Sequence, residues 1–562
     1  MCGICGIFGS PERGALERMM VSLESRGPDG SGVFLDGPIG LGIRRLSIID
    51  IPGGSQPIFN EDGSLCIVFN GEIYNYRELR SFLSSRGHRF STDSDTEVII
   101  HAFEEFGVSC VRHLRGIFAF AIWDASKKRL FLARDRFGVK PLFFSRIKGS
   151  FVFASDVKSL FSSGLVGPAI DQDSLWEQAI FGCSIGDSTL FSGVKRLLPG
   201  HALELGASGE CLQKYWSLEV FSDDSLSEPD AAARLRPMFD DAVRAELVSD
   251  VGFGVLLSGG LDSSLLAAQA GSLSSSPLHT FSISDDGSNE DLANARLVAG
   301  HLGADHHEFL VSPDDAISAF PSYILGTADI APHFVYGVWM HLLSERVSKF
   351  QKVVLCAQGA DELFAGYEHL ADPLHFRMEH LEGRWAFFSP PSGFRQAGFF
   401  RQLVSDVSSR GLDAILSHEL SNCLPNNQLA LVDSASMQFG LEVRVPFLDA
   451  QFADLAMRIP SSLKRKDGVE KHILRRAFSG ADLPPGILTR PKVPAGASTL
   501  PNFSAALERL ANSLVPDARL RSHRHAHLLR SKVGVLSFDL LESLFIDNCA
   551  SVPKGFGLSD LY

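Results

Sequence analysis

One stretch of the chain restricts the possible folds more than any other: VLLSGGLDSSLLAAQ, residues 255–269. An apolar, strand-like run passes directly into Ser258-Gly259-Gly260, and a helix-like run follows. Glycine lets the backbone approach a ligand closely, and the first turn of a helix offers unpaired N–H groups to an anion. The segment therefore predicts a strand, an anion-binding loop and a helix, although it matches neither G-x-x-x-x-G-K-S/T nor G-x-G-x-x-G.

The polar side chains of this loop suit a phosphorylated ligand. Asp262 suggests a Mg²⁺ ion that bridges to phosphate. A second segment, CAQGADELFAGY (356–367), places Asp361 and Glu362 just past another buried strand, where α/β sheets bind their ligands. We therefore expect Asp361 to be a second Mg²⁺ ligand. The hydroxyl donors of the loop are Ser258, Ser263 and Ser264.

The second half of the chain alternates between strand-like and helix-like segments. The strand-like runs are VGFGVLL (251–257), LHTFSIS (278–284) and KVVLCAQ (352–358). Helices are expected from about Leu261 and over 290–303. This alternation predicts an α/β domain with a parallel sheet.

The first 200 residues are organised differently. Helices are expected over 14–27 and 94–107, where apolar residues recur on one face. Strands and helices gathered in separate runs favour an α+β sandwich. The short β-branched and aromatic runs that predict strands are 65–75, 116–124, 129–138 and 151–155.

A chain of 562 residues is too long for one ordinary core, so we expect two domains. The first spans residues 1–210 and the second spans 231–520. A polar, acidic linker occupies 211–230, and a helical tail occupies 521–562.

Composition argues against several classes of function. The chain carries 52 Lys and Arg against 66 Asp and Glu, a net charge of −14, which disfavours nucleic acid or an anionic membrane as the main partner. No apolar run reaches the roughly 18 residues of a membrane span, and no signal peptide is indicated. Nine cysteines at irregular spacing fit free thiols in a reducing compartment, so we expect a cytoplasmic protein.

Two of the cysteines, Cys2 and Cys5, form a C-x-x-C at the start of the chain. No second C-x-x-C and no zinc-finger histidine pair follows, which disfavours a metal knuckle or a redox pair. Removal of Met1 would place the Cys2 thiol beside an α-amine with a pKa of about 8, which suits a general base. This makes an N-terminal nucleophile at Cys2 possible, although few cysteines at position 2 have that role, and Cys5 is expected to be a small buried hydrophobe.

The motifs around Cys2 come in a characteristic order. They are Cys2-Gly3-Ile4, RGPDG (26–30), RRLSIID (44–50), FNGEIYNY (69–76), SDTE (94–97) and RDRFGVKPLF (134–143). Together they resemble the class II glutamine amidotransferase domain.

The SGGLDSS loop resembles that of the ATP pyrophosphatase family. With the amidotransferase motifs in one chain, the resemblance is to the glutamine-hydrolysing asparagine synthetase family, from residue 1 to about 500. Two further segments match it, FGLEVRVPFLD (439–449) and VEKHILRRAF (469–478). The resemblance implies a four-layer α+β sandwich of the N-terminal nucleophile hydrolase type, followed by a parallel-sheet ATP-pyrophosphatase domain.

In the first domain the resemblance assigns a role to each matching residue. Cys2 attacks the side-chain amide of glutamine, and Asn70 with the Gly71 N–H forms the oxyanion hole. The residues expected to bind glutamine are Arg45 for its α-carboxylate, Asn70, and Glu72 and Asp95 for its α-ammonium.

In the second domain the resemblance implies ATP on the loop and on the strand ends. Lys471 stabilises the phosphates as an acyl-adenylate forms, and Gln358 occupies a catalytic position. The expected metal ligands are Asp262 and Asp361. The expected ATP-binding residues are Leu256, Ser258, Gly259, Gly260, Asp262, Ser263, Ser264, Ile283, Cys356 and Ala357.

The sequence departs from the family pattern at four places. Gln358 replaces a glutamate and cannot act as a general base, and Ser434 stands where an arginine is usual. Asp156 replaces a longer glutamate. Residues 490–498 differ from the usual K-x-x-F-x-x-G-x-G loop. These departures leave the acceptor less well defined than the nucleotide chemistry.

The resemblance implies ATP-dependent synthesis of asparagine. Glutamine hydrolysis at Cys2 releases ammonia, which crosses the protein and attacks β-aspartyl-AMP, giving asparagine, AMP, pyrophosphate and glutamate. Glutamine, aspartate and ATP are the implied substrates, Mg²⁺ with ATP the cofactor and a homodimer the assembly. Two alternatives stay open: a paralogue that amidates another carboxylate by the same chemistry, and a non-catalytic relative that binds glutamine or nucleotide.

Overall fold

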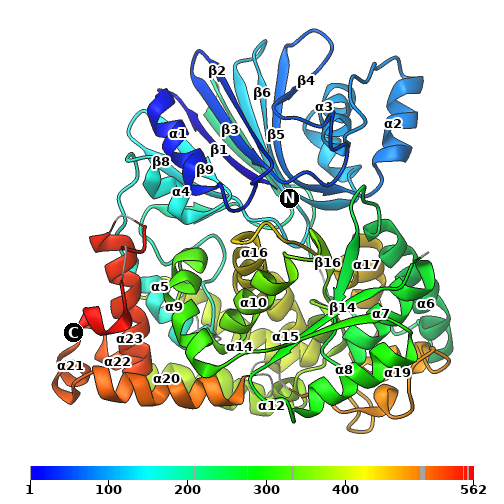
Figure 1. Ribbon diagram of the computed structural model, residues 1–562, viewed down its shortest axis with the longest axis vertical. Coiled ribbons are helices and arrows are strands. Elements are labelled where there is room, and N and C mark those ends of the chain that lie inside the picture. The colour runs from blue at the N-terminus through cyan, green and yellow to red at the C-terminus, as the bar shows by residue number, and fades with distance from the viewer. Residues whose placement is uncertain are drawn as a thin grey trace.

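Two six-stranded antiparallel sheets stack face to face in the first domain (Figure 1). The computed structural model describes residues 2–562 apart from 208, 219, 275, 331–333, 494–499, 549 and 554–555. One sheet has the order β10 (Val194–Arg196), β8 (Phe143–Ile147), β9 (Ser150–Ala154), β1 (Gly3–Phe8), β3 (Ile39–Arg45) and β2 (Gly30–Asp36). The other has the order β12 (Gly209–Lys214), β11 (His201–Gly206), β7 (Arg129–Arg134), β6 (Gly116–Asp124), β5 (Leu65–Ile73) and β4 (Ile58–Phe59).

Helices cover the outer face of each sheet. Helices α1 (Arg13–Ser22) and α4 (Val157–Ser162) pack on the first sheet. Helix α3 (Asp95–Phe106) packs on the second, and α2 (Tyr76–Ser85) packs on α3. The expected four-layer sandwich is therefore confirmed.

Local signals place these elements close to where the sequence predicts them. Helix α3 starts after Ser94, whose hydroxyl accepts from the Thr96 N–H at 3.2 Å, and it stops at Gly107. Helix α1 is shorter than the predicted 14–27, because the chain leaves the helix after Ser22 and turns. That turn brings Arg26 Nε to 3.4 Å from the carbonyl oxygen of Cys2.

Strand β1 separates the two N-terminal cysteines. Successive side chains of a strand point to opposite faces of its sheet. Cys2 and Ile4 belong to the core between the two sheets, whereas Cys5 belongs to the core beneath α1. Cys2 and Cys5 therefore do not form a paired C-x-x-C site.

The second domain is built on a parallel sheet of five strands. Its order is β15 (Asp305–Leu310), β14 (His279–Ser284), β13 (Phe253–Leu256), β16 (Val353–Leu355) and β17 (Glu442–Arg444). The parallel sheet agrees with the prediction, and β15 and β17 add strands at its two edges. The strand order reverses direction between β13 and β16, so the loops after these two strands flank a topological switch point.

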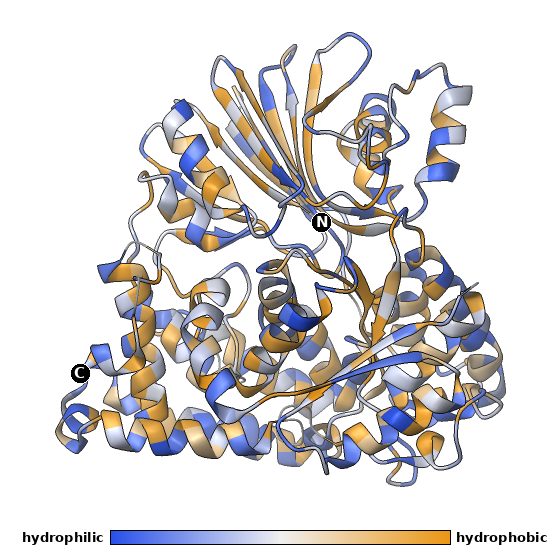
Figure 2. Ribbon diagram, viewed as in Figure 1, coloured by the Kyte–Doolittle hydropathy of each residue, from blue (hydrophilic) through white to orange (hydrophobic). Residues whose placement is uncertain are grey.

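Long helices surround this sheet. They are α6 (Glu228–Glu246), α7 (Leu261–Leu273), α8 (Glu290–His301), α9 (Pro313–Thr327), α10 (Phe334–Val347), α14 (Ala397–Arg410), α16 (Leu429–Met437), α17 (Ala450–Arg458), α20 (Pro501–Leu514) and α23 (Lys532–Glu542). Shorter helices that matter below are α11 (Ala360–Phe364), α18 (Ser461–Lys464) and α19 (His472–Ala477). Figure 2 shows hydrophobic residues along the strands and the inward faces of these helices.

The segment between the domains is shorter than the sequence suggests. Strand β12 continues to Lys214 because each of its residues pairs with β11, and α6 begins at Glu228 after a Ser227 cap. At the other end, α23 packs against α20 and α9, so the residues expected as a tail join the core of the second domain. Among the described residues, none of the helices combines the length and the hydropathy needed to cross a membrane.

Candidate active sites

Cys2 lies between the sheets of the first domain, at its junction with the second domain, near the N-terminus marked in Figure 1. Only 6% of the residue is exposed. Its backbone nitrogen donates to Asn70 Oδ1 at 3.0 Å. Burial raises the pKa of the Cys2 thiol, while the Leu46 amide and the Arg45 guanidinium lower it. The buried thiol therefore needs a nearby base to become a thiolate.

Two potential oxyanion donors adjoin each other in β5. Asn70 is fully buried, and its Nδ2 finds no hydrogen-bond partner within the described part of the chain. Gly71 follows with a φ of 155°, and a Cβ there would lie 2.1 Å from the carbonyl oxygen of Ile117. Because buried polar groups are almost always paired, the free Asn70 amide is available to a ligand beside Cys2.

Arg45 is held rigidly at the end of β3. Its guanidinium donates to the carbonyl oxygens of Ile49 at 3.1 Å, Asp50 at 2.7 Å and Ile51 at 3.1 Å. Gly3, which follows Cys2, pairs with Arg44 in the sheet, so Arg45 lies near Cys2, and its charge lowers the pKa of that thiol. A fixed guanidinium suits two-point binding of a carboxylate.

A buried carboxylate cluster lies on the other side of the site. Glu72 Oε2 is 3.7 Å from Arg444 Nη2, and Arg444 Nε donates to Glu442 Oε1 at 2.5 Å. Asp95 begins α3 and accepts from the Ile73 N–H at 2.9 Å. Glu72 and Glu442 therefore share the Arg444 guanidinium, whose charge also acts on Asp95, while Lys140 adds a second positive charge near Glu442.

Burial and the neighbouring charges shift the pKa values of Glu72 and Asp95. Burial raises the pKa of Glu72, and the charges of Glu442 and Asp95 raise it further, against the lowering effect of Arg444. Burial also raises the pKa of Asp95, to about 6. A bound ammonium group would favour the ionised form of both acids.

The second site is centred on the loop between β13 and α7. The hydroxyls of Ser258 and Ser263 are hydrogen-bonded to each other at 3.0 Å, and the Gly260 N–H donates to the Ser258 hydroxyl at 3.4 Å. Gly259 has a φ of 72°, and a Cβ there would lie 2.6 Å from backbone atoms of α8. Ser264 is fully buried, and its hydroxyl has no partner within the described chain. The loop is thus a tight turn that leads into α7, with the Ser258 hydroxyl beside the hydroxyl of Ser263 in the first turn of that helix.

An ion cluster joins this loop to distant segments. Lys471 Nζ lies 2.5 Å from both Asp262 Oδ2 and Asp361 Oδ1, and Lys492 Nζ lies 2.6 Å from Asp361 Oδ2. Lys471 is 2% exposed and has a φ of 53°, a left-handed conformation that is costly outside glycine. Asp262 Oδ1 is buried without a hydrogen-bond partner in the described chain.

These neighbours set the charge states of the cluster. Burial lowers the pKa of Lys471, but Asp262 and Asp361 raise it above its ordinary value. Burial opposes ionisation of Asp361, but Lys471 and Lys492 hold its pKa well below the usual range. Burial and the charge of Asp361 raise the pKa of Glu362 to about 7. Lys471 therefore carries its full charge at neutral pH.

The remaining residues that are predicted to bind ATP lie at the ends of neighbouring strands. Leu256, Ile283 and Cys356 are buried at the carboxyl ends of β13, β14 and β16, and Ala357 follows Cys356. Gln358 comes next, and its amide donates to the Tyr336 hydroxyl. These side chains, the loop and the ion cluster thus all lie at the carboxyl ends of the parallel strands.

The comparisons with known proteins decide the family. Residues 1–216 match the model of a glutamine amidotransferase domain, and residues 234–536 match that of asparagine synthase. Glutamine-hydrolyzing asparagine synthetase 3 of Bacillus subtilis (strain 168) is 33% identical over 549 residues, covering 90% of this chain and 88% of that protein. The chain belongs to the asparagine synthetase family.

Other asparagine synthetases are similarly related. The Triphysaria versicolor protein is 33% identical over 585 residues, covering 99% of this chain and 88% of that protein. Among solved structures, glutamine phosphoribosylpyrophosphate amidotransferase from B. subtilis is 16% identical with a TM-score of 0.32, covering 55% of this chain and 91% of that chain.

Sequence reasoning missed several residues that join the two domains of this chain. Arg26 Nη2 is 2.8 Å and Lys140 Nζ is 3.6 Å from the two oxygens of Asp433 in α16. Arg444, in the second domain, reaches Glu72 in the first. Arg26 and Arg444 both lie inside recognised motifs, RGPDG and FGLEVRVPFLD, and this is the signal that could have found them.

The structure gives three of the family departures a local context. Asp156 caps α4 by accepting from the Ser159 N–H at 2.8 Å, a role that suits a short side chain. Ser434 follows the interdomain residue Asp433. Lys492, within the divergent 490–498 segment, pairs with Asp361, while residues 494–498 of that segment lie outside the described residues.

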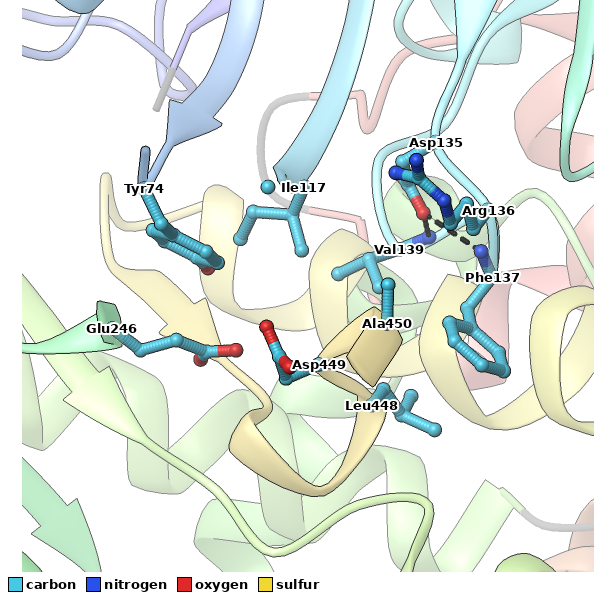
Figure 3. A pocket seen from close by; sticks show the side chains of 11 residues that line it. Tyr74, Ile117, Asp135, Arg136, Phe137, Val139, Glu246, Leu448, Asp449 and Ala450 are labelled. Carbon is cyan, nitrogen blue, oxygen red and sulfur yellow. Dashed lines mark hydrogen bonds between the residues drawn. The ribbon is translucent and has the colours of Figure 1, made fainter. Parts of the chain in front are cut away.

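A small cavity of about 10 Å³ lies between the domains (Figure 3). Tyr74 Oη and Glu246 Oε2 line it without hydrogen-bond partners in the described chain, and Asp449 points toward them. Its volume suits about one water molecule. The cavity includes neither Cys2 nor a predicted ATP residue, so the ammonia route stays a prediction.

Proposed function

We propose that this chain makes asparagine from aspartate, glutamine and ATP. One observation carries the proposal: each site holds a buried polar atom that lacks a partner in the described chain and suits its substrate or the Mg²⁺ ion that accompanies it. In the first domain it is Asn70 Nδ2 beside Cys2, and in the second it is Asp262 Oδ1 beside Lys471. Both atoms belong to the motifs that define the family.

In the first half-reaction, the Cys2 thiol gives its proton to its own α-amine once Met1 is removed, and the thiolate attacks the glutamine amide carbon. Asn70 Nδ2 and the Gly71 N–H stabilise the oxyanion. Ammonia leaves with a proton, and water then releases glutamate from the thioester. Arg45 holds the α-carboxylate, and Glu72 with Asp95 holds the α-ammonium.

In the second half-reaction, the β-carboxylate of aspartate attacks the α-phosphorus of ATP and pyrophosphate leaves. Lys471 stabilises the charge that develops on the phosphates. Ammonia then attacks the β-carbonyl of aspartyl-AMP, and AMP leaves. Gln358, an amide, acts by hydrogen bonding rather than as a base.

Two carboxylates of this site fit a Mg²⁺ ion that accompanies ATP. Asp262 Oδ1 is buried and unpaired in the described chain, and Asp361 meets the same lysine, so both would supply oxygen ligands. When bound, Mg²⁺ would neutralise phosphate charge. The homodimer and the cytoplasmic location stay predictions.

The glutaminase reaction should show a two-step dependence on acid. The α-amine base has a pKa of about 8. Below that pH, a plot of log(kcat/KM) for glutamine against pH should therefore have a slope of one. Asp95 has a pKa of about 6, so below pH 6 it is protonated and loses its attraction for the α-ammonium. The slope should therefore steepen to two below pH 6. In Asp95→Asn it should stay at one, and an unchanged steep limb in that variant would rule out Asp95.

Exchange of labelled pyrophosphate into ATP tests the proposed acceptor. With Mg²⁺ and no nitrogen donor, aspartate should support exchange at least about tenfold faster than glutamate, succinate or β-alanine, because a site that hydrogen-bonds one acceptor discriminates against analogues that differ in length or lack its polar groups. Exchange that depends on another carboxylate, and not on aspartate, would identify the chain as a paralogue with a different product. Exchange with none of them, together with absent glutaminase turnover, would make it a non-catalytic relative.

A further inference from the structure

A cluster of histidines and glutamates lies in the outer helical layer of the first domain, separate from both active sites. Glu61 lies in the turn after β4, and His88 follows α2. His101 and Glu104 are one turn apart on α3. Their nearest nitrogen and oxygen atoms all lie within 4.8 Å of one another.

The spacing of the donor atoms is that of a tetrahedral metal site. His101 Nδ1 is 2.8 Å from Glu104 Oε2 and 3.6 Å from Glu61 Oε2. His88 Nδ1 is 3.5 Å from the same Glu104 oxygen and 3.8 Å from Glu61 Oε1. Zinc bonds of 2.0–2.1 Å at tetrahedral angles place ligand atoms about 3.3 Å apart. The four side chains therefore need little adjustment to bind one ion.

The opposite ring nitrogens face a second set of carboxylates. His101 Nε2 is 3.5 Å from Glu97 Oε1, and His88 Nε2 is 3.6 Å from Glu105 Oε2. Neither contact is a hydrogen bond, and His101 Nε2 is buried without a partner in the described chain. In metal sites the second nitrogen of a histidine ligand usually donates to a carboxylate, and Glu97 and Glu105 are placed to accept from these rings after a small shift. Nδ1 of each histidine faces the oxygen atoms of Glu61 and Glu104.

Backbone and amide donors orient the two glutamate ligands. Glu61 Oε1 accepts from the Arg89 N–H at 2.8 Å, and Glu104 Oε1 accepts from Asn60 Nδ2 at 2.8 Å. Each carboxylate keeps its other oxygen, Oε2, within reach of His101 Nδ1. Hydrogen bonds therefore hold both glutamate ligands in place.

The glutamates of this cluster outnumber their lysine and arginine partners, which favours binding of a cation. Four glutamates surround the two imidazoles, and Arg86 pairs with one of them, Glu105, at 2.9 Å. Within the described part of the chain, the ion pairs give Glu61, Glu97 and Glu104 no lysine or arginine. His101 is fully buried, whereas Glu61 and Glu104 are exposed, so the negative charge lies on the solvent side of a buried imidazole.

We propose that Glu61, His88, His101 and Glu104 bind one divalent transition-metal ion, zinc being the best fit to two imidazoles and two carboxylates. The ion ties α3 to the ends of α2 and β4. Since α3 begins at Asp95, the site steadies the helix that carries an expected glutamine-binding acid, although the proposal does not depend on that role.

Zinc binding by the full-length protein tests this site directly. After chelator treatment and dialysis against ZnCl₂, the wild-type chain should retain one more zinc per chain than His88→Asn, and its apparent zinc affinity should be at least about tenfold higher. Zinc should also raise the Tm of the wild type more than that of the variant. His301→Asn is the matched control: it removes a histidine that pairs with a single carboxylate, Asp482 at 2.7 Å, and should bind as much zinc as the wild type.

The side chain of His88 is 15% exposed and lies in the turn after α2, outside helix and strand, and equal Tm values in chelator would verify that its replacement leaves the fold intact. If that variant does not fold, Glu61→Gln serves instead, because its side chain is 35% exposed. Equal zinc content in wild type and variant, or none in either, would overturn the proposal and leave the cluster as an ion-pair network of protonated histidines.

Discussion

The Cys2→Ala variant should lose glutamine-dependent asparagine synthesis by a factor on the order of 10⁴ and keep ammonia-dependent synthesis within about twofold. Alanine cannot form the thioester, whereas the ion cluster around Lys471 lies in the other domain and does not involve this thiol. Steady-state assays of both reactions on the same preparation measure the difference. Loss of both reactions together would contradict the separation of the two sites.

Cys5→Ala is the matched control. Cys5 is as deeply buried, three residues away, but belongs to the core beneath α1. It should keep glutaminase activity and lose only the small stability of a buried side chain. An N-terminal tag that blocks removal of Met1 should reproduce Cys2→Ala, because it removes the free α-amine. Normal glutaminase activity in the uncleaved tagged protein would rule out that amine as the base.

The Lys471→Met variant should show the second large effect. Pyrophosphate exchange and asparagine synthesis from either nitrogen donor should fall about 10³-fold, because the charge that stabilises the phosphates is gone. Glutaminase turnover without ATP should remain. Asp262 would also lose its only ion-pair partner among the described residues, so the Tm of the ATP-free variant should change.

A second buried lysine provides a control that distinguishes a loss of catalysis from a loss of stability. Lys464 in α18 is fully buried, and its Nζ has no hydrogen-bond partner in the described chain. Lys464→Met should leave exchange within about twofold, since it removes a desolvated charge that makes no hydrogen bond to a predicted ATP residue in the described chain. Equal loss of exchange in both variants would mean that Lys471 acts only through the fold.

Much of the architecture could be predicted because its signals are local. Strand β13, the SGG turn and α7 follow one another within 253–273, and Ser94 and Gly107 bound α3. Alternating strands and helices then suffice for a parallel sheet. The motif order adds the family, and with it the two-sheet sandwich.

Contacts between the domains could not be predicted in the same way. Arg26 and Asp433 meet although 407 residues separate them, and no local pattern carries that information. Lys492 seemed only a departure from a familiar loop, yet it pairs with Asp361. Strand β12 extends past the expected boundary at 210 because pairing with β11, rather than composition, decides where a strand ends.

Transfer of nitrogen from glutamine labelled with ¹⁵N at its amide tests the proposed function most directly. The protein is incubated with the labelled glutamine, aspartate and Mg-ATP, and all products are measured by NMR and mass spectrometry. We expect ¹⁵N at the side-chain amide of asparagine, with one AMP and one pyrophosphate formed for each asparagine. Labelled ammonia released without asparagine, AMP or pyrophosphate, or the label in the amide of another acid, would contradict the assignment.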